Sequence, residues 1–393
     1  MHSVAILPRV STHHPGAGTA PTYLDAFALL TEVVDELVVR SVHDTHDAWA
    51  ERFGGYPGSA IAGAVFGGLG AGLRAASAGL GKVAATGVGP RLEEGPRGRF
   101  VSSAVNGLIG DRLVAERPRL AIPMAVRSEG RDVPPATDHL AAAFPDAAGR
   151  VVVFVHGLCE NESYWNRWRE RTGTTYGETV TDAGWTPVFL RANTGLGLRE
   201  NGVALAALLQ RLVEEWPVPL QRIALVGHSM GGLIVRAAGA VVHLAEHQAE
   251  RHWADLVSDV VTLGTPHLGA PIARGIGHGS RGLGRRRETA AFGRILDQRS
   301  VGVHDLVSGL AEDVPPLPHA RYRLVAATVT ARQRHPVGHV VGDLLVRVPS
   351  AYGRDRHGRH LFPGADVLHL GRTDHFGLLN HPEVHRALRE WLA

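Results

Sequence analysis

The sequence is poor in cysteine and carries no export signal that we recognise. Cys159 is the single cysteine among 393 residues, which excludes an internal disulfide and fits a reducing compartment. The N-terminal stretch "MHSVAILPRVSTHHPGAG" lacks the cationic start, sustained apolar run and small-residue cleavage site of a secretory signal. We therefore predict a cytoplasmic protein in which residues 1–20 form a disordered leader.

Strong charge of either sign is also missing. The chain has 41 Lys and Arg against 38 Asp and Glu, a formal net charge of +3, and its basic residues are scattered except for "RGLGRRR" at 281–287. This pattern is not the concentrated basic footprint of a nucleic-acid-binding protein. The histidine pair at 13–14 lies in the leader, and the later histidine spacings fit no helical pair of metal ligands. We expect no nucleic-acid partner, no metal site and no cofactor.

No apolar run is long enough to span a bilayer. Within the glycine- and alanine-rich segment 59–90, the uncharged part covers only 60–73 before Arg74 interrupts it, whereas a spanning helix needs about 20 residues. Small residues recur at every fourth position, as at Gly63 and Gly67, which allows helical backbones to approach closely. The segment therefore has two interpretations, a close-packed helical pair or an apolar surface that touches lipid and associates with membranes peripherally.

Composition divides the chain near residue 150. Residues 21–149 are expected to form an N-terminal helical domain, because apolar residues follow a three-and-four spacing over 21–53 and a second helical pattern covers about 101–115. The Pro-bearing and charged stretch at 116–139, "ERPRLAIPMAVRSEGRDVPPATDH", is expected to link this domain to the next.

From residue 150 the sequence alternates between strand and helix patterns. "RVVVFVHGL" (150–158) is a β-branched run that ends in glycine, as in a strand buried on both faces. The other expected strands are "TPVFLRAN" (186–193), "RIALVGHS" (222–229), "DVVTLGTP" (259–266), "YRLVAATVT" (322–330) and "DVLHLG" (366–371). The alternation predicts an α/β fold with a mostly parallel sheet that helices cover on both faces.

One serine stands at the carboxyl end of an expected strand. In "VGHSMGGL" (226–233), Ser229 lies between the strand 222–229 and a helical pattern, with Gly227 and Gly231 two positions away on either side. This is the Gly-x-Ser-x-Gly nucleophile elbow in the context it requires. The turn exposes the serine hydroxyl and directs the first N–H groups of the helix at whatever the serine attacks.

A serine nucleophile needs a base and an acid that follow it in the chain. His375 lies in the loop after the last strand, where it can reach back over the serine; the main rival is His381, which opens the last helix with Asn380 as its expected N-cap. His369 falls inside the last strand. We therefore predict His375 as the base.

Three aspartates are candidates for the acid. Asp343 follows the strand 322–330 and precedes the last strand, the place where this fold carries its acid. Asp374 adjoins His375, and neighbouring side chains usually diverge, whereas Asp366 begins the last strand at the opposite edge of the sheet. We therefore predict Asp343 as the acid.

The first expected strand ends in a candidate oxyanion loop. After His156 and Gly157, the backbone N–H of Leu158 can point into the same space as that of Met230. His156 is interpreted as a residue that fixes the loop and not as a second base. Cys159 is interpreted as a small buried hydrophobe, because nothing in the sequence activates it.

From about residue 150 to the C-terminus, the chain resembles serine esterases and lipases of the α/β-hydrolase superfamily, in particular a bacterial lipase-like group related to GPI inositol-deacylases. The segments that carry the resemblance are "VHGL", "YGETVTDAGWTPVFLRANTG", "NGVALAALL", "LVGHSMGGLIVRAA", "LGTPHLGAP", "GDLLV" and "TDHFGLL". The resemblance implies an α/β-hydrolase catalytic domain over 150–393 that hydrolyses esters. Ser229, Asp343 and His375 would be its triad, and Leu158 and Met230 its oxyanion donors.

The insertion 272–320, rich in glycine and arginine, is expected to form a cap or lid over the serine. An unrelated surface excursion is the alternative. The function predicted first is a serine carboxylic-ester hydrolase that acts on a small-molecule or lipid ester. An acyltransferase that uses the same acyl-enzyme and a non-catalytic α/β-hydrolase binding module are the other two functions considered. A non-catalytic binding module would be expected to lack at least one of the five site residues, which are the triad and the two oxyanion donors. All five positions are filled here.

Overall fold

The computed structural model describes residues 20–33, 71–72, 75–84, 86, 89–242, 251–270, 300–310, 314–333, 335, 342–355 and 357–393. The expected leader, apart from residue 20, lies outside the described residues. So do three other parts of the predictions, namely 34–53 of the first amphipathic pattern, 59–70 of the glycine-rich segment and most of the cap, 272–299.

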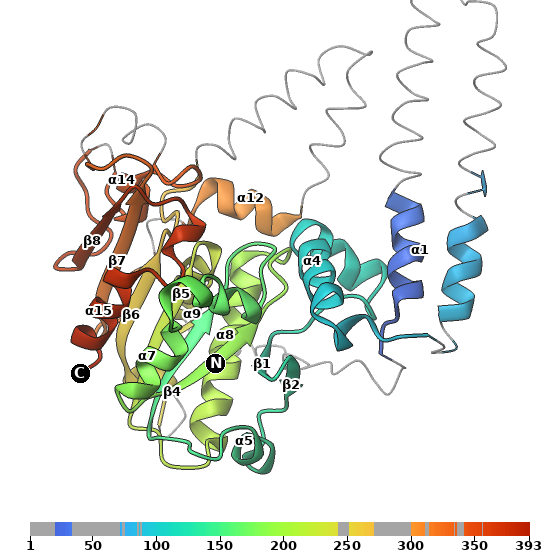
Figure 1. The fold of residues 1–393 in the computed structure, drawn as a ribbon, viewed down its shortest axis with the longest axis horizontal. Helices are drawn as coiled ribbons and strands as arrows, with labels where there is room; N and C mark the ends of the chain where they lie inside the picture. Colours follow the sequence, from blue (N-terminus) through green and yellow to red (C-terminus); the bar gives the residue numbers. More distant parts are fainter. Residues whose placement is uncertain are drawn as a thin grey trace, which may run out of the picture.

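A single eight-stranded sheet contains the strands of the described part of the chain (Figure 1). Across the sheet the order is β2-β1-β4-β3-β5-β6-β7-β8. The strands are β1 Ala125–Ser128, β2 Arg131–Val133, β3 Arg150–Val155, β4 Thr186–Arg191, β5 Arg222–His228, β6 Val257–Leu263, β7 Arg321–Thr328 and β8 Asp366–Gly371. All pairs from β4 to β8 are parallel, so the carboxyl ends of these strands meet at one edge. The predicted α/β fold with a mostly parallel sheet is confirmed.

The stretch expected to be a linker instead extends the sheet. β1 pairs antiparallel with β4, and β2 pairs antiparallel with β1. The two strands are joined at Glu129 and Gly130, which have φ values of 50° and 75°, the left-handed conformations that a two-residue hairpin turn requires. The sheet therefore begins about 25 residues before the predicted start of the hydrolase domain.

Helices cover both faces of the sheet (Figure 1). The helices of the described residues, with short 3-10 turns marked η, are α1 Tyr23–Val33, η2 Leu92–Glu94, α4 Pro96–Glu116, α5 Thr137–Ala143, η3 Glu162–Asn166, α6 Arg169–Thr172, α7 Tyr176–Asp182, α8 Leu198–Glu215, α9 Met230–Val242, η4 Trp253–Leu256, α12 Val301–Ser308, α14 Val348–Ala351, η5 Phe376–Leu378 and α15 Pro382–Trp391. Alternate residues of β3 enter different cores because a strand points successive side chains to opposite faces. Val153 packs in one core with Leu209 of α8, and Phe154 packs in the other with Leu388 of α15.

The N-terminal helical region reaches the sheet through α4, which Figure 1 shows between α1 and α12. At Gly107 of α4 the backbone lies so close to Cys159 that an added Cβ would be 2.9 Å from the Cys159 Cα. At Gly110 an added Cβ would be 2.7 Å from the Cγ of Asn193. On the cap side, the Ser300 hydroxyl donates to the carbonyl of Gly107 at 2.8 Å. The glycines of α4 therefore allow the helix to pack directly on loops at the carboxyl edge of the sheet.

Three glycines in the described part of the segment 59–90 are different. Among the described residues, a Cβ added at Gly72, Gly79 or Gly81 would meet no atom within 4 Å. Close packing against the described part of the chain does not explain glycine at these three positions.

This contrast predicts opposite effects of one methyl group at two helical glycines. Gly107→Ala should lower the free energy of unfolding by about 1–3 kcal/mol, because the methyl must displace the backbone of Cys159. Gly79→Ala, the matched control in open space, should raise it by up to about 1 kcal/mol, because alanine loses less backbone entropy in a helix than glycine does. Denaturant unfolding of both variants measures the difference. A Gly107→Ala protein as stable as the parent would show that α4 is not held against this loop.

Candidate functional site

Ser229 occupies the turn between β5 and α9 in a strained backbone conformation. Its φ is 51°, in the left-handed region that residues other than glycine rarely adopt. Its amide donates to the carbonyl of Leu263, the last residue of β6, at 2.8 Å. The serine is therefore fixed at the carboxyl edge of the sheet, between the central strands.

The flanking glycines make this turn sterically possible. A Cβ at Gly227 would lie 2.5 Å from the Cα of Gly232, and one at Gly231 would lie 2.7 Å from the carbonyl oxygen of His156 and closer still to that of Val155. Real Cβ atoms do not approach backbone atoms so closely. Both glycines therefore let α9 begin directly on top of β3 and β5.

Two residues from distant loops meet beside this turn. The Nδ1 of His375 lies 2.8 Å from Oδ2 of Asp343, and both side chains are buried. The backbones are joined as well, because the His375 amide donates to the Asp343 carbonyl at 2.9 Å. The other carboxylate oxygen, Oδ1, accepts from the amides of Leu345 and Val346. With Asp343 held as an acceptor, Nδ1 of His375 carries the proton and Nε2 is left to accept one.

Contacts on both sides of Ser229 bring it to the His375–Asp343 pair. The residue before it, His228, has its ring centroid 4.9 Å from that of His375. On the other side, the Ser229 amide donates to the carbonyl of Leu263, and the next residue is Gly264. A Cβ added at Gly264 would lie 3.2 Å from both Oδ2 of Asp343 and Cε1 of His375. The three predicted site residues are thus gathered at one place.

The rival candidates have other partners. Asp374 is exposed and its Oδ1 accepts from the amide of Gly377 at 2.7 Å. Asp366 pairs with Arg323 at the start of β8, and His369 contacts Thr328. His381 is itself the N-cap of α15, since its Nδ1 accepts from the Glu383 amide at 3.2 Å.

The expected N-cap of the last helix was therefore wrong. Asn380 is buried and has a φ of 53°. Its side chain accepts from the amide of Tyr176 and donates to the carbonyls of Trp165 and Arg167. Asn380 therefore joins the loop before α15 to the segment 165–176.

The expected oxyanion loop lies against the start of α9. Among the described residues, neither the amide of Leu158 nor that of Met230 has a hydrogen-bond acceptor within the protein. His156 binds only backbone: Nε2 accepts from the Ala192 amide at 3.0 Å, which leaves Nδ1 protonated to donate to the Gly157 carbonyl at 2.9 Å. Burial lowers the pKa of His156, which favours this neutral form.

Cys159 follows the oxyanion loop and is shielded by α4. Its Sγ donates to the carbonyl of Ala104 at 3.6 Å, and its amide donates to the hydroxyl of Thr194. Burial raises the pKa of the thiol to about 11, so at neutral pH it is protonated and a poor nucleophile.

Sequence reasoning missed a buried pair of side chains, Glu160 and His228, next to Ser229. Oε2 of Glu160 lies 3.0 Å from Nδ1 of His228 and also accepts from the Gly157 amide at 2.7 Å. Both side chains are buried. In the sequence, Glu160 is a charged residue just after the oxyanion loop, and His228 is a histidine in an apolar strand. Neither feature indicates that the two side chains are partners.

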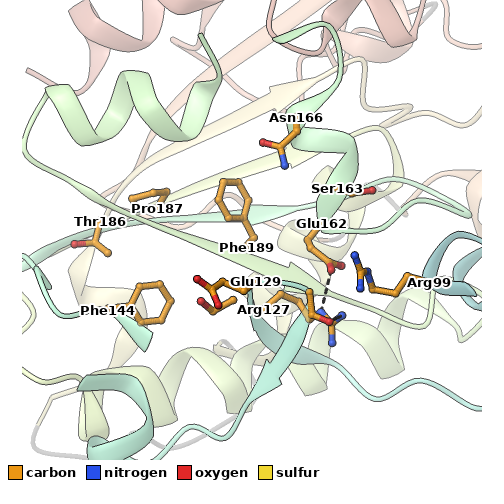
Figure 2. A pocket seen from close by; sticks show the side chains of 12 residues that line it. Arg99, Arg127, Glu129, Phe144, Glu162, Ser163, Asn166, Thr186, Pro187 and Phe189 are labelled. Atoms are coloured by element: carbon orange, nitrogen blue, oxygen red, sulfur yellow. Dashed lines mark hydrogen bonds and ion pairs between the residues drawn. The ribbon is translucent and has the colours of Figure 1, made fainter. Parts of the chain in front are cut away.

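The cavity in Figure 2 lies away from this site. It encloses about 510 Å³ and is lined by residues of β1, β4, α4 and η3, with none of Ser229, Asp343 and His375 among them. Arg127 and Glu162 face each other in it, 3.1 Å apart (Figure 2), and Arg127 also pairs with Asp132. Because the buried Arg127 is already paired with these two carboxylates, we assign the cavity no ligand.

Within the residues that the structure describes, no helix is both long enough and apolar enough to cross a bilayer. The same residues contain no group of three or more His, Cys, Asp or Glu side chains placed to hold a metal ion.

Residues 146–278 match the family model described as "Putative serine esterase (DUF676)". The matched region runs from before β3 to beyond β6 and includes Leu158 and Ser229. The match covers about a third of the chain and supports an enzyme of the serine esterase class on the mostly parallel sheet described above.

Several solved structures are similar to this chain. Mature lipase BlEst2 from Bacillus licheniformis shares 21% identity at a TM-score of 0.43, over 62% of this chain and 91% of the lipase. Carboxylesterase CesB (YbfK) from Bacillus subtilis shares 12% at 0.37, over 74% and 98% of the two chains. Lipase 1 from Pelosinus fermentans shares 14% at 0.39, over 62% and 99%. No curated protein matches the sequence.

Proposed function

We propose that the protein hydrolyses carboxylic esters through an acyl-enzyme formed on Ser229, with His375 as the base and Asp343 as the acid. The observation that carries the proposal is the buried hydrogen bond between His375 and Asp343, 2.8 Å long, beside a serine in a strained strand-to-helix turn. The more specific resemblance to GPI inositol-deacylases stays a prediction.

The chemistry follows from the protonation of His375. Its Nε2 takes the proton of the Ser229 hydroxyl as Oγ attacks the ester carbonyl, and Asp343 stabilises the resulting imidazolium. The carbonyl oxygen becomes negative and accepts from the amides of Leu158 and Met230. The imidazolium then protonates the leaving alcohol. Water repeats the sequence on the acyl-enzyme and releases the acid, which restores Ser229.

We further propose that the preferred ester has a hydrophobic acyl group. Leu344 and Leu345 directly follow the acid, and Phe376 directly follows the base, yet these three apolar side chains are exposed. Leu108 of α4 and Val301 of α12 are exposed too, and they adjoin a backbone contact between α4 and Ser300. Exposed apolar residues beside catalytic groups fit an apolar substrate.

The first test is a panel of p-nitrophenyl esters with increasing acyl length. We expect turnover by the parent protein to rise from acetyl to medium-length chains. Ser229→Ala should lower kcat by about 10³-fold or more without loss of fold, because no other group supplies the nucleophile. Near-normal turnover by a folded Ser229→Ala protein would refute the mechanism.

The second test separates the two neighbouring aspartates. Asp343→Asn should lower kcat by about 10²–10⁴-fold, because an amide at this position can donate to Nδ1 and favours the wrong tautomer of His375. Asp374→Asn, an isosteric change one residue from the base, should alter kcat by less than about threefold, since this carboxylate only caps a turn. Steady-state kinetics on one short-chain ester compares them, and the reverse ranking would make Asp374 the acid.

We also propose that the enzyme is cytoplasmic and contacts lipid peripherally through the segment 59–90. Only a few side chains in it are bulky, among them Ile61, Val65 and Phe66. Replacing these three with Asp in the full chain should abolish co-flotation with phosphatidylcholine vesicles, because interfacial binding depends on buried apolar area. Val203→Asp, a change at an exposed apolar residue of α8, serves as the control. Equal flotation of the parent and the triple variant would leave the segment with an internal packing role.

A further inference from the structure

A buried hydrogen-bond chain joins the oxyanion loop to the backbone of the catalytic base. It begins at the Gly157 amide, which donates to Oε2 of Glu160 at 2.7 Å. The same oxygen lies 3.0 Å from Nδ1 of His228. At the far end, Nε2 of His228 lies 3.3 Å from the carbonyl oxygen of His375. The chain thus runs from one side of Ser229 to the other without using the serine itself.

The partners of His228 determine its protonation state. A backbone carbonyl can only accept, and the Glu160 carboxylate that binds the Gly157 amide also accepts. With Glu160 ionised, both ring nitrogens of His228 donate, so the ring is an imidazolium and Glu160 is its counter-ion. A buried charge of either sign would be costly alone, whereas the pair offsets it.

The electrostatics agree with this assignment. Burial lowers the pKa of His228, but the adjacent Glu160 carboxylate raises it by more, so the net shift is upward. Burial raises the pKa of Glu160, but the His228 cation and the Gly157 amide lower it by more, so the net shift is downward. Both groups therefore stay charged over a wider pH range than they would in water.

We propose that Glu160 and His228 are positioning residues that hold the oxyanion loop and the catalytic base in register across Ser229. The proposal rests on the proposed function, since it assigns Leu158 and His375 their roles in ester hydrolysis. Glu160 fixes the loop one residue before the Leu158 amide, and the His228 cation fixes His375 through its carbonyl. Neither side chain would touch the ester.

The proposal predicts which kinetic constant changes. Displacing an oxyanion donor or a base weakens interactions made in the transition state and leaves ground-state binding of the acyl group largely intact. Loss of the pair should therefore lower kcat much more than it raises KM. A general loss of packing would instead lower the active fraction without a change in pH dependence.

The pH dependence has a definite sign. The charged groups around His228 are Glu160 in the loop after β3 and Asp343 after β7, and the rings of His156 and His375 lie close to the Glu160–His228 pair. Because the pKa of His228 is raised, its contribution is complete below the ordinary histidine pKa and is lost as pH rises through the raised value. The parent enzyme should lose kcat at alkaline pH while it remains folded.

Replacing Glu160 or His228 with glutamine breaks the hydrogen-bond chain. In Glu160→Gln, the oxygen that accepts two hydrogen bonds must become either an amide oxygen without charge or an NH₂ group that cannot accept from Gly157. In His228→Gln, the amide is too short to donate to Glu160 and to the His375 carbonyl together. The matched control is His385→Gln, which removes another buried histidine that contacts Thr179 and Tyr176.

The kinetic arm compares these variants on one short-chain ester between pH 6 and pH 10. Glu160→Gln and His228→Gln should lower kcat by about 10–100-fold at pH 7.5 with KM within about threefold, and His228→Gln should lack the alkaline decline. His385→Gln should keep the parent profile. Parent-like kcat and alkaline decline in folded His228→Gln would overturn the proposal.

A spectroscopic arm keeps the test independent of the proposed function. In protein labelled with ¹⁵N-histidine, the His228 signal, assigned by its loss in His228→Gln, should show two protonated ring nitrogens at pH 7.5. Glu160→Gln should abolish this state and shift the His375 ring signal, whereas His385→Gln should do neither. A singly protonated His228 in the parent would overturn the proposal even if the protein hydrolyses esters. If no ester is hydrolysed, the proposed function fails and these spectra alone decide whether the pair holds His375.

Discussion

The close approach of the helix α9 to the strands β3 and β5 is the constraint on which the site depends. No side-chain atom fits between the backbone of Gly231 and the carbonyls of Val155 and His156, or between Gly227 and Gly232. The helix therefore begins directly above the sheet, and the intervening residue, Ser229, is driven into the left-handed region. The left-handed backbone of Ser229 therefore accompanies the close contact between α9 and the ends of β3 and β5.

The loops around the elbow are held by charge and backbone contacts and only in part by apolar packing. Asp343 uses one oxygen for two amides of its own loop and the other for His375. Glu160 likewise binds an amide of its own loop and a histidine from elsewhere. Each carboxylate therefore fixes its own loop and also contacts the ring of one of two histidines that are adjacent in space.

The parts of the fold and site that follow from local spacing could be predicted from the sequence. The strands from β3 to β8 are continuous apolar runs, and Ser229, Gly227 and Gly231 sit in a single pentapeptide. His375 and Asp343 followed from chain order in this fold. The hairpin β1–β2 was missed because its strands have only four and three residues and carry charges that are paired in space, as Arg127 is with Asp132. Glu160 and His228 are 68 residues apart, and no local pattern connects them.

The contacts of α4 also determine the order in which the protein can be completed. The helix spans Pro96–Glu116, yet it packs on Cys159, on Asn193 and on Ser300, so its last partner lies 193 residues beyond Gly107. During synthesis the helix emerges before any of these partners exists, and loop closure over such separations is slow. The helix that shields the oxyanion loop therefore cannot complete its contacts until Ser300 has been synthesised.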